Sequence, residues 1–177
     1  FEGWELRKIA VTTGYKTLSK QSGEYIVLDF DSLGSLFDLS FGIMSELYDG
    51  FRAQSVIGKD WSERQVMIKF IEKYRTAYLT RSTATLDDIF AEEAIIIIGR
   101  VFNRSKPGSE GYGYMKLNNS QPDYEQIKMN KKEFLERQKR TFANLQDLHI
   151  SFSTLKINRK NDEDGVYGIS LRQNYNS

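Results

Sequence analysis

A single long helix between segments of strand pattern is the feature that most constrains this fold. Apolar side chains recur at helical spacing over residues 63–81 and define the stripe Met67, Phe70, Ile71, Tyr74, Ala77 and Tyr78. Ser62 and Gln65 fit a capping box at its start, and Trp61 can pack onto Val66 as a hydrophobic staple. One long helix among many strands favours the α+β class, because few helices must cover the sheets.

The residues before this helix have a strand pattern. Apolar segments at 4–11, 24–30 and 36–41 predict three strands. The turn between the last two ends in Gly34, which predicts a hairpin with a positive φ at that glycine. A short amphipathic helix is expected between residues 43 and 51. We therefore expect a β-rich segment with a short helix over residues 1–58 and a second unit over 59–177.

The residues after the long helix alternate between helix and strand patterns. The predicted elements are a short helix from Thr85, a strand at 94–102, a long loop at 103–123, a short strand at 124–129, a helix capped by Asn130 and Glu133, and two long strands at 148–159 and 166–175. Four consecutive isoleucines, 95–98, predict that the strand at 94–102 is covered on both faces. The alternation slips between Phe152 and Leu155, which predicts a β-bulge and a bent sheet.

This order predicts a bent antiparallel sheet wrapped round one long helix, an α+β cone preceded by a β-meander. Residues 60–177 resemble the nuclear-transport-factor-2-like (SnoaL-like) superfamily. The resemblance rests on the helix Glu63–Arg81, on the passage LDDIFAEEA at 86–94 and on the passage VYGISLRQNY at 166–175. More narrowly, the chain resembles a group of uncharacterised bacterial proteins in which a β-rich segment precedes the cone.

The resemblance carries two further expectations. Members of that group continue after a segment like residues 173–175 with two more strands, so we expect the cone to lack its last strands here. Their longer polypeptide is exported, which implies a periplasmic or cell-envelope location. Enzymes of the superfamily hold a carboxylate or histidine base inside the cone, but the functions of the superfamily are many, so the resemblance leaves the activity open.

Composition narrows the available chemistry. The 177 residues hold one histidine and no cysteine, which excludes disulfides, thiolate nucleophiles and zinc sites built from cysteine or several histidines.

The 25 basic and 24 acidic residues nearly balance, so nothing favours a nucleic-acid partner. The basic stretch 131–140 also contains Glu133 and Glu136, which predicts a solvated helix face. The longest apolar run, 94–98, is too short to cross a membrane. We expect no metal, no cofactor, no nucleic acid and no transmembrane segment.

Few ionisable residues fall on the predicted inward faces of strands. Glu125 shares a strand face with Ile127 and Met129, although an exposed glutamate at the rim is the simpler interpretation. His149 alternates with Ile150 and is expected to point away from the apolar face, with no carboxylate in register to tune it. These two residues are the weak catalytic candidates.

Polar groups on apolar faces are the candidates for a pocket. Tyr74 and Tyr78 lie on the core stripe of the long helix, where buried hydroxyls need partners. Gln173 stands on the apolar face of the last strand, where it either lines a pocket or sits at the rim. The predicted pocket-lining residues are Phe70, Tyr74, Tyr78, Tyr167 and Gln173.

Three functions remain open at this point. The first is a non-catalytic cone domain that binds a small apolar ligand or a protein partner. The second is a small-molecule isomerase or dehydratase that uses Glu125 or His149 with Tyr74 or Tyr78. The third is a structural module that forms a homodimer through its sheet. The scarcity of inward-facing acids and of histidine favours the first.

Overall fold

The computed structural model describes residues 3–14, 21–53, 61–102, 123–145, 148–159 and 165–176. The strands are β1 (Gly3–Gly14), β2 (Gln21–Asp31), β3 (Leu36–Phe41), β4 (Ile96–Phe102), β5 (Asp123–Met129), β6 (His149–Arg159) and β7 (Tyr167–Asn176). The helices are α1 (Ser45–Ala53), α2 (Trp61–Leu79), α3 (Thr83–Ile89) and α4 (Lys131–Asn144). All strand pairs are antiparallel, which confirms the predicted α+β class with antiparallel sheets.

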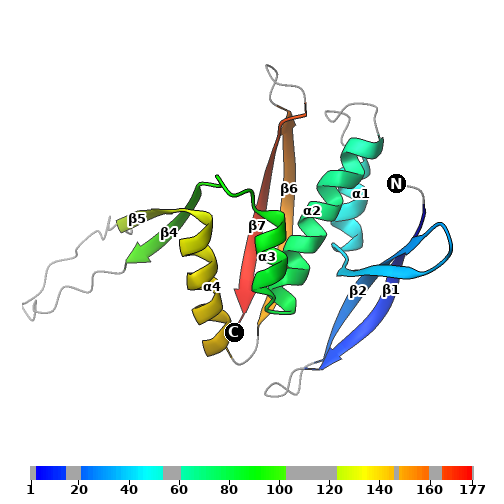
Figure 1. Cartoon of the computed structure of the whole chain (residues 1–177), viewed down its shortest axis with the longest axis horizontal. Helices are drawn as coiled ribbons and strands as arrows, with labels where there is room; N and C mark the ends of the chain where they lie inside the picture. The colour runs from blue at the N-terminus through cyan, green and yellow to red at the C-terminus, as the bar shows by residue number, and fades with distance from the viewer. Residues whose placement is uncertain are drawn as a thin grey trace, which may run out of the picture.

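The strands form three separate sheets within the described ranges. Their orders are β1-β2-β3, β4-β5 and β6-β7. The long helix α2 contacts β3 on one side and β6 and α3 on the other, so it joins the N-terminal sheet to the rest (Figure 1). The β4-β5 pair lies at the opposite end of the molecule from the N-terminal sheet. In the described part of the chain, no helix has the length and apolar character that a membrane span requires.

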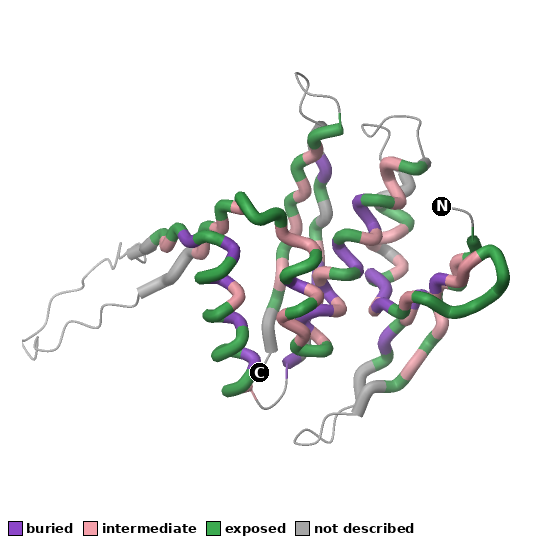
Figure 2. Tube along the Cα trace, in the orientation of Figure 1, coloured by how far each residue is buried: buried purple, intermediate pink, exposed green. Residues whose placement is uncertain are grey.

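The main core lies between α2, α3, α4 and β6 (Figure 2). Its largest fully buried apolar side chains are Ile68 of α2, Leu86 of α3 and Ile150 of β6, each at most 2% exposed. Phe134 and Phe142 bring one face of α4 into the same cluster. The core is thus built where three helices meet a two-stranded sheet.

The buried side of α2 differs from the predicted stripe. Phe70 is 41% exposed, whereas Ile68 is buried. The N-terminal sheet covers the side of α2 that bears Ile68, Glu72 and Arg75, so the buried arc of the helix is rotated away from Phe70. The helix also begins at Trp61, so Ser62 lies inside it and the predicted cap at Ser62 is wrong.

The local signals at the other helix ends are mostly confirmed. Asn130 and Glu133 form the predicted capping box of α4, with each side chain accepting the other residue's backbone N–H at 2.9 Å. α3 begins earlier than predicted, because Ser82 caps it by accepting the N–H of Thr85 at 3.1 Å. Both caps satisfy backbone donors that a helix start leaves free.

Two irregular backbone positions were predicted and are confirmed. The pairing of β6 with β7 shifts between Ser153 and Lys156, and Thr154 in this bulge has a φ of 55°. The turn between β2 and β3 places Gly34 at a φ of 84°, which an L side chain rarely adopts. The bulge lets Phe152 and Ile157, which differ in alternation, both be buried.

The isoleucine strand is covered on one face only, contrary to the prediction. Ile95 and Ile97 are 64% and 59% exposed, whereas Ile96 and Ile98 pack against the core. β4 belongs to a two-stranded sheet, and the helices lie on one side of it. The other face therefore stays open in the described part of the chain.

The N-terminal sheet turns its charged face toward α2 and its apolar face outward. Cross-strand partners share a face, and three rows of such partners are entirely apolar. The rows are Trp4–Phe30–Leu36, Leu6–Leu28–Leu39 and Ile9–Ile26–Phe41. We call these residues the outward apolar face; Trp4 is 69% and Leu6 53% exposed.

Candidate functional site

An open pocket of about 570 Å³ lies between α2, α3, α4 and β4. Its walls are mainly apolar and consist of Phe90, Ile96, Ile97, Ile98, Phe134, Phe142, Leu145 and Leu148. Its polar lining residues are Tyr74, Tyr78, Arg137, Gln138 and Thr141. A volume of this size lies within the range of roughly 300–1,000 Å³ that small-molecule sites occupy.

The periodicities of helices and strands explain why the lining residues of the pocket face the same space. Tyr74 and Tyr78 are four residues apart on α2, so they lie on one face of that helix. Alternation along β4 turns Ile96 and Ile98 to the same side. On α4, Phe134 begins a series at four-residue spacing that also includes residues 138 and 142. The pocket is therefore bounded by one face each of two helices and a strand.

The tyrosine edge of the pocket is held in place by aromatic packing. The hydroxyl of Tyr74 lies 3.1 Å from the hydroxyl of Tyr78 and 3.4 Å from Oε1 of Gln173 on β7. Tyr74 carries a single hydroxyl proton, so it donates to one of these partners at a time. The Tyr74 ring stacks on Phe152 at 6.2 Å, and the Tyr78 ring meets Phe142 edge-on at 5.5 Å.

The second polar edge of the pocket comes from α4. Gln138 is 9% exposed and lines the pocket, and no described residue forms a hydrogen bond with its side chain. Arg137 is exposed, and no carboxylate of the described residues lies within 4 Å of its guanidinium. Thr141 donates its hydroxyl to the backbone oxygen of Arg137 at 3.0 Å. Two of these three groups thus keep free hydrogen-bonding capacity beside the pocket.

The predicted pocket residues have three different positions. Tyr74 and Tyr78 line the pocket, and Gln173 reaches its edge through Tyr74. Phe70 lies outside the lining because the buried arc of α2 is rotated away from it. Tyr167 is half-buried at the start of β7, six residues before Gln173. At about 3.3 Å per residue this spacing is about 20 Å, which is too far to reach the pocket.

The two weak catalytic candidates, Glu125 and His149, are not among the described lining residues of the pocket. Glu125 belongs to β5 and His149 begins β6. Their side chains fall outside the described residues. Among the residues that are described, no group of three or more acidic or histidine side chains could hold a metal ion.

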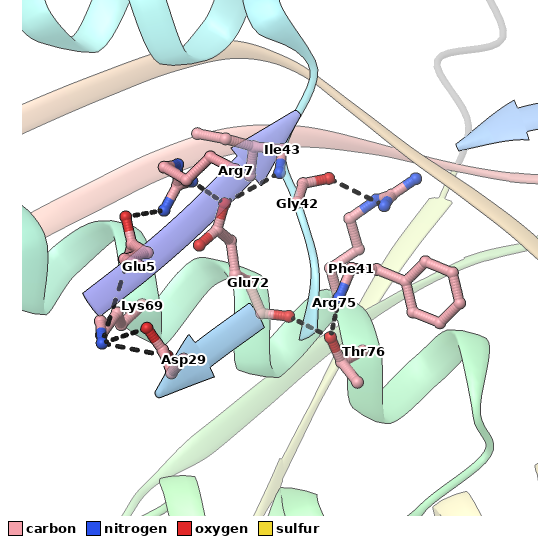
Figure 3. Close-up of polar contacts among 10 residues, drawn as sticks. All are labelled: Glu5, Arg7, Asp29, Phe41, Gly42, Ile43, Lys69, Glu72, Arg75 and Thr76. Carbon is pink, nitrogen blue, oxygen red and sulfur yellow. Dashed lines mark hydrogen bonds and ion pairs between the residues drawn. The ribbon is translucent and has the colours of Figure 1, made fainter. Parts of the chain in front are cut away.

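A second polar cluster joins α2 to the N-terminal sheet (Figure 3). We call it the buried charge network; its members are Glu5, Arg7, Glu24, Asp29, Lys69, Glu72 and Arg75. Arg7 binds both Glu5, at 3.0 Å, and Glu72. Lys69 contacts both oxygens of Asp29 at 3.1 Å.

Arg75 lies at the other end of the network. It donates to Oε2 of Glu24 at 2.5 Å and to the backbone oxygen of Gly42 at 2.9 Å. Arg75 is only 4% exposed and Glu24 only 6%. Buried charges of this kind need paired partners, and here each charge has one from the opposite element.

Glu72 is the most deeply buried member, with 1% exposure. Its burial raises the pKa of the carboxyl above its usual range, and the attraction of Arg7 and the N–H of Ile43 at 3.1 Å oppose that change only in part. Burial alone would lower the pKa of Arg7, but Glu72 and Glu5 raise it, so the guanidinium stays charged. The network holds four carboxyls and three cations, so its charge also favours one extra proton.

The charge network is a structural contact rather than a ligand site. The depression beside it, lined in part by Glu5, Arg7 and Lys69, has no room for a water-sized molecule. Its members are satisfied by one another. The pocket between α2, α3, α4 and β4 is therefore the candidate site.

Sequence reasoning missed the α4 edge of the pocket. The stretch 131–140 was predicted to be a solvated face, yet Gln138 is buried in it. A signal was present, because Gln138 lies four residues from Phe134 and four from Phe142, within the apolar stripe. Arg137 and Thr141 flank that stripe and carried no comparable signal.

Comparison with family models, with characterised proteins and with solved structures finds no match for this chain. The function must therefore be argued from the site itself. A fold alone would not supply it in any case, since unrelated functions share folds.

Proposed function

We propose that the chain binds a small apolar molecule in the pocket between α2, α3, α4 and β4 without catalysing a reaction on it. The observation that supports this is the composition of the lining: apolar walls with a few polar groups gathered at two edges. Such linings bind and orient ligands. The polar lining groups that are described are hydroxyls, an amide and a guanidinium, which suit binding better than general-base work at neutral pH.

The proposal includes the cone fold for residues 59–177 and membership of the nuclear-transport-factor-2-like superfamily. What supports it is the long helix α2 packed across β6, the short α3 that follows, and the bulge that bends β6. The exported location expected from the same resemblance is part of this proposal. The β-rich segment 1–58 is the added subdomain.

The test is binding of N-phenyl-1-naphthylamine, an uncharged dye that fluoresces in apolar surroundings. Thr141→Trp places a large ring at the pocket and is expected to raise the dissociation constant at least tenfold, because the ring occupies the dye's volume. Thr80→Trp is the matched control. Thr80 is also an exposed threonine whose hydroxyl donates to the carbonyl four residues earlier, but it does not line the pocket.

The proposal fails if wild type gives no dye signal, or if both tryptophan variants bind the dye as wild type does. The second result would place the dye on another apolar surface of the protein. Circular dichroism of each variant shows whether the fold is retained, so loss of binding can be separated from loss of structure.

A second candidate function, self-association, is favoured by the outward apolar face. Trp4, Leu6, Leu36 and Leu39 are each about half exposed or more. Large apolar side chains present roughly 150–250 Å² each when fully exposed, so these four residues offer roughly 330–550 Å². Two apposed copies would bury roughly 700–1,100 Å², which is the size of weak or transient interfaces.

A second copy is the occupant that fits this face. An apolar sheet face can pack on its own copy about a two-fold axis and would form a β-sandwich. An anionic membrane surface suits it less, because none of the residues of the outward apolar face is basic and acids outnumber bases on the three strands as a whole. The acids are Glu5, Glu24, Asp29, Asp31 and Asp38, and the bases are Arg7 and Lys8.

Sedimentation equilibrium tests this second candidate. Wild type is expected to form a dimer, and Leu6→Gln combined with Leu39→Gln is expected to weaken it at least thirtyfold, because both residues lie in the central row. Leu33→Gln is the control, since Leu33 is 89% exposed in the turn and outside the face. A monomeric wild type, or binding to anionic vesicles without dimerisation, would contradict the candidate.

A further inference from the structure

The α4 edge gathers three polar side chains at one place in an apolar wall. Thr141 lies four residues after Arg137 and three after Gln138, so all three project from neighbouring positions of the helix. Phe134 and Phe142 flank Gln138 at four-residue spacing and form part of the same wall. Any ligand in the pocket that packs on these rings also meets the polar group between them.

The side-chain amide of Gln138 is available to a ligand in the pocket. Gln138 is 9% exposed, lines the pocket, and has no hydrogen-bond partner among the described residues. A ligand in the pocket can supply a hydrogen-bond partner for this amide. The amide N–H groups can donate to an oxygen held there.

Arg137 determines which charge on a ligand the pocket favours. It is the one charged residue among the described lining residues of the pocket. Lys131, at the start of the same helix, forms ion pairs with Asp87 at 2.7 Å and Glu92 at 2.6 Å and does not line the pocket. Glu133, one turn before Arg137, is occupied in the capping box. Arg137 thus gives the pocket one positive charge, which favours a ligand with one negative charge.

We infer that the pocket takes an amphipathic molecule whose apolar body fills the cavity and whose terminal carboxylate is bound by Arg137 and Gln138. This rests on the proposed function and specifies the class of ligand. A guanidinium fork and an amide N–H together match the two oxygens of a carboxylate. A phosphate would bring nearly two charges and three strong acceptor oxygens, which one arginine would not satisfy. Thr141 positions the edge through its bond to the Arg137 backbone.

The test compares ligands that share a chain and differ in the head group. Isothermal titration calorimetry is performed with dodecanoate, dodecan-1-ol and dodecyl phosphate, all below their aggregation concentrations. Wild type is expected to bind dodecanoate about ten- to a hundredfold more tightly than dodecanol, as for one charge-assisted hydrogen bond. Arg137→Gln is expected to remove that preference and leave the affinity for dodecanol unchanged.

Two further variants sharpen the result. Arg140→Gln is the matched control, because Arg140 is an exposed arginine of the same helix that does not line the pocket. Gln138→Leu is expected to weaken dodecanoate binding several-fold while the variant unfolds at the same or a higher urea concentration than wild type. A merely structural role for Gln138 would instead leave binding intact.

The outcomes separate this inference from the proposed function. Equal affinities for dodecanoate and dodecanol, both lost in Thr141→Trp, would overturn the carboxylate and leave the apolar pocket standing. Tighter binding of dodecyl phosphate, or equal losses in Arg137→Gln and Arg140→Gln, would also overturn it. No binding of any chain by wild type would defeat the proposed function itself.

Discussion

Replacing Arg75 with methionine is expected to lower the free energy of unfolding by about 3–5 kcal/mol. Arg75 is 4% exposed and donates to Oε2 of Glu24 and to the carbonyl of Gly42. Methionine occupies a similar volume but donates no hydrogen bond, so the Glu24 carboxylate, which is 6% exposed, loses its ion pair with Arg75. Breaking a buried ion pair by removing one partner is among the most damaging changes that a single substitution makes.

Urea denaturation with linear extrapolation measures this loss. Lys8→Met is the control, because the Lys8–Asp49 pair is 4.0 Å long and both side chains are more than half exposed; its loss should be within about 1 kcal/mol. The double variant Arg75→Met/Glu24→Leu should recover much of the stability, since it removes the unpaired charge as well. An Arg75→Met variant within 1 kcal/mol of wild type would show that the network does not hold α2 to the sheet.

The parts of the fold that follow from neighbouring residues could be predicted from the sequence. The capping box of Asn130 and Glu133 depends on residues three apart. Gly34 in its turn and the slip of alternation around Thr154 are likewise local. Each is decided by backbone sterics or by the side-chain period of a strand.

The buried charges could not be predicted in the same way. Arg7 meets Glu72 across 65 positions of sequence, and Arg75 meets Glu24 across 51. A charged side chain on a strand normally indicates the solvent face. Here the charged face is the inner one. Only the long-range pairing with α2 makes that burial possible.

Only the α2 side of the pocket was predicted, because the α4 side depends on contacts between residues that are distant in the sequence. Tyr74 and Tyr78 stood out because they are polar groups in the stripe of a recognisable helix. Gln138 carried the same signal on α4, but the surrounding charges concealed it. The ligand-binding potential of Arg137 depends on which acids lie near it in space, and Glu133 turns away to cap the helix instead. The periodicity of apolar residues along a helix does not show which of several polar partners a side chain will bind.

Replacing Glu72 with glutamine is expected to make the protein more stable relative to wild type as the pH rises. Burial raises the pKa of Glu72 in the folded state above its unfolded value, so the folded protein binds more protons at this site than the unfolded chain does. The contribution of Glu72 to the free energy of unfolding of wild type therefore decreases as the pH rises. The decrease begins near the unfolded pKa, about 4.3, and ends above the pKa of the folded state. Glutamine does not titrate, so the variant lacks this loss.

The quantity to measure is the difference in free energy of unfolding between Glu72→Gln and wild type, by urea denaturation from pH 4 to pH 8. It should be constant at the acid end, rise by at most about 1.4 kcal/mol per pH unit in the window between the two pKa values, and level off above it. All other titrating groups are common to both proteins, so the subtraction removes them as long as they do not couple to Glu72. Arg7→Met tests that coupling: without the opposing cation, the pKa of Glu72 should rise further and the window should extend to higher pH. A difference that falls with rising pH would mean that the attraction of Arg7 outweighs burial, and that the network binds α2 as a fully ionised pair.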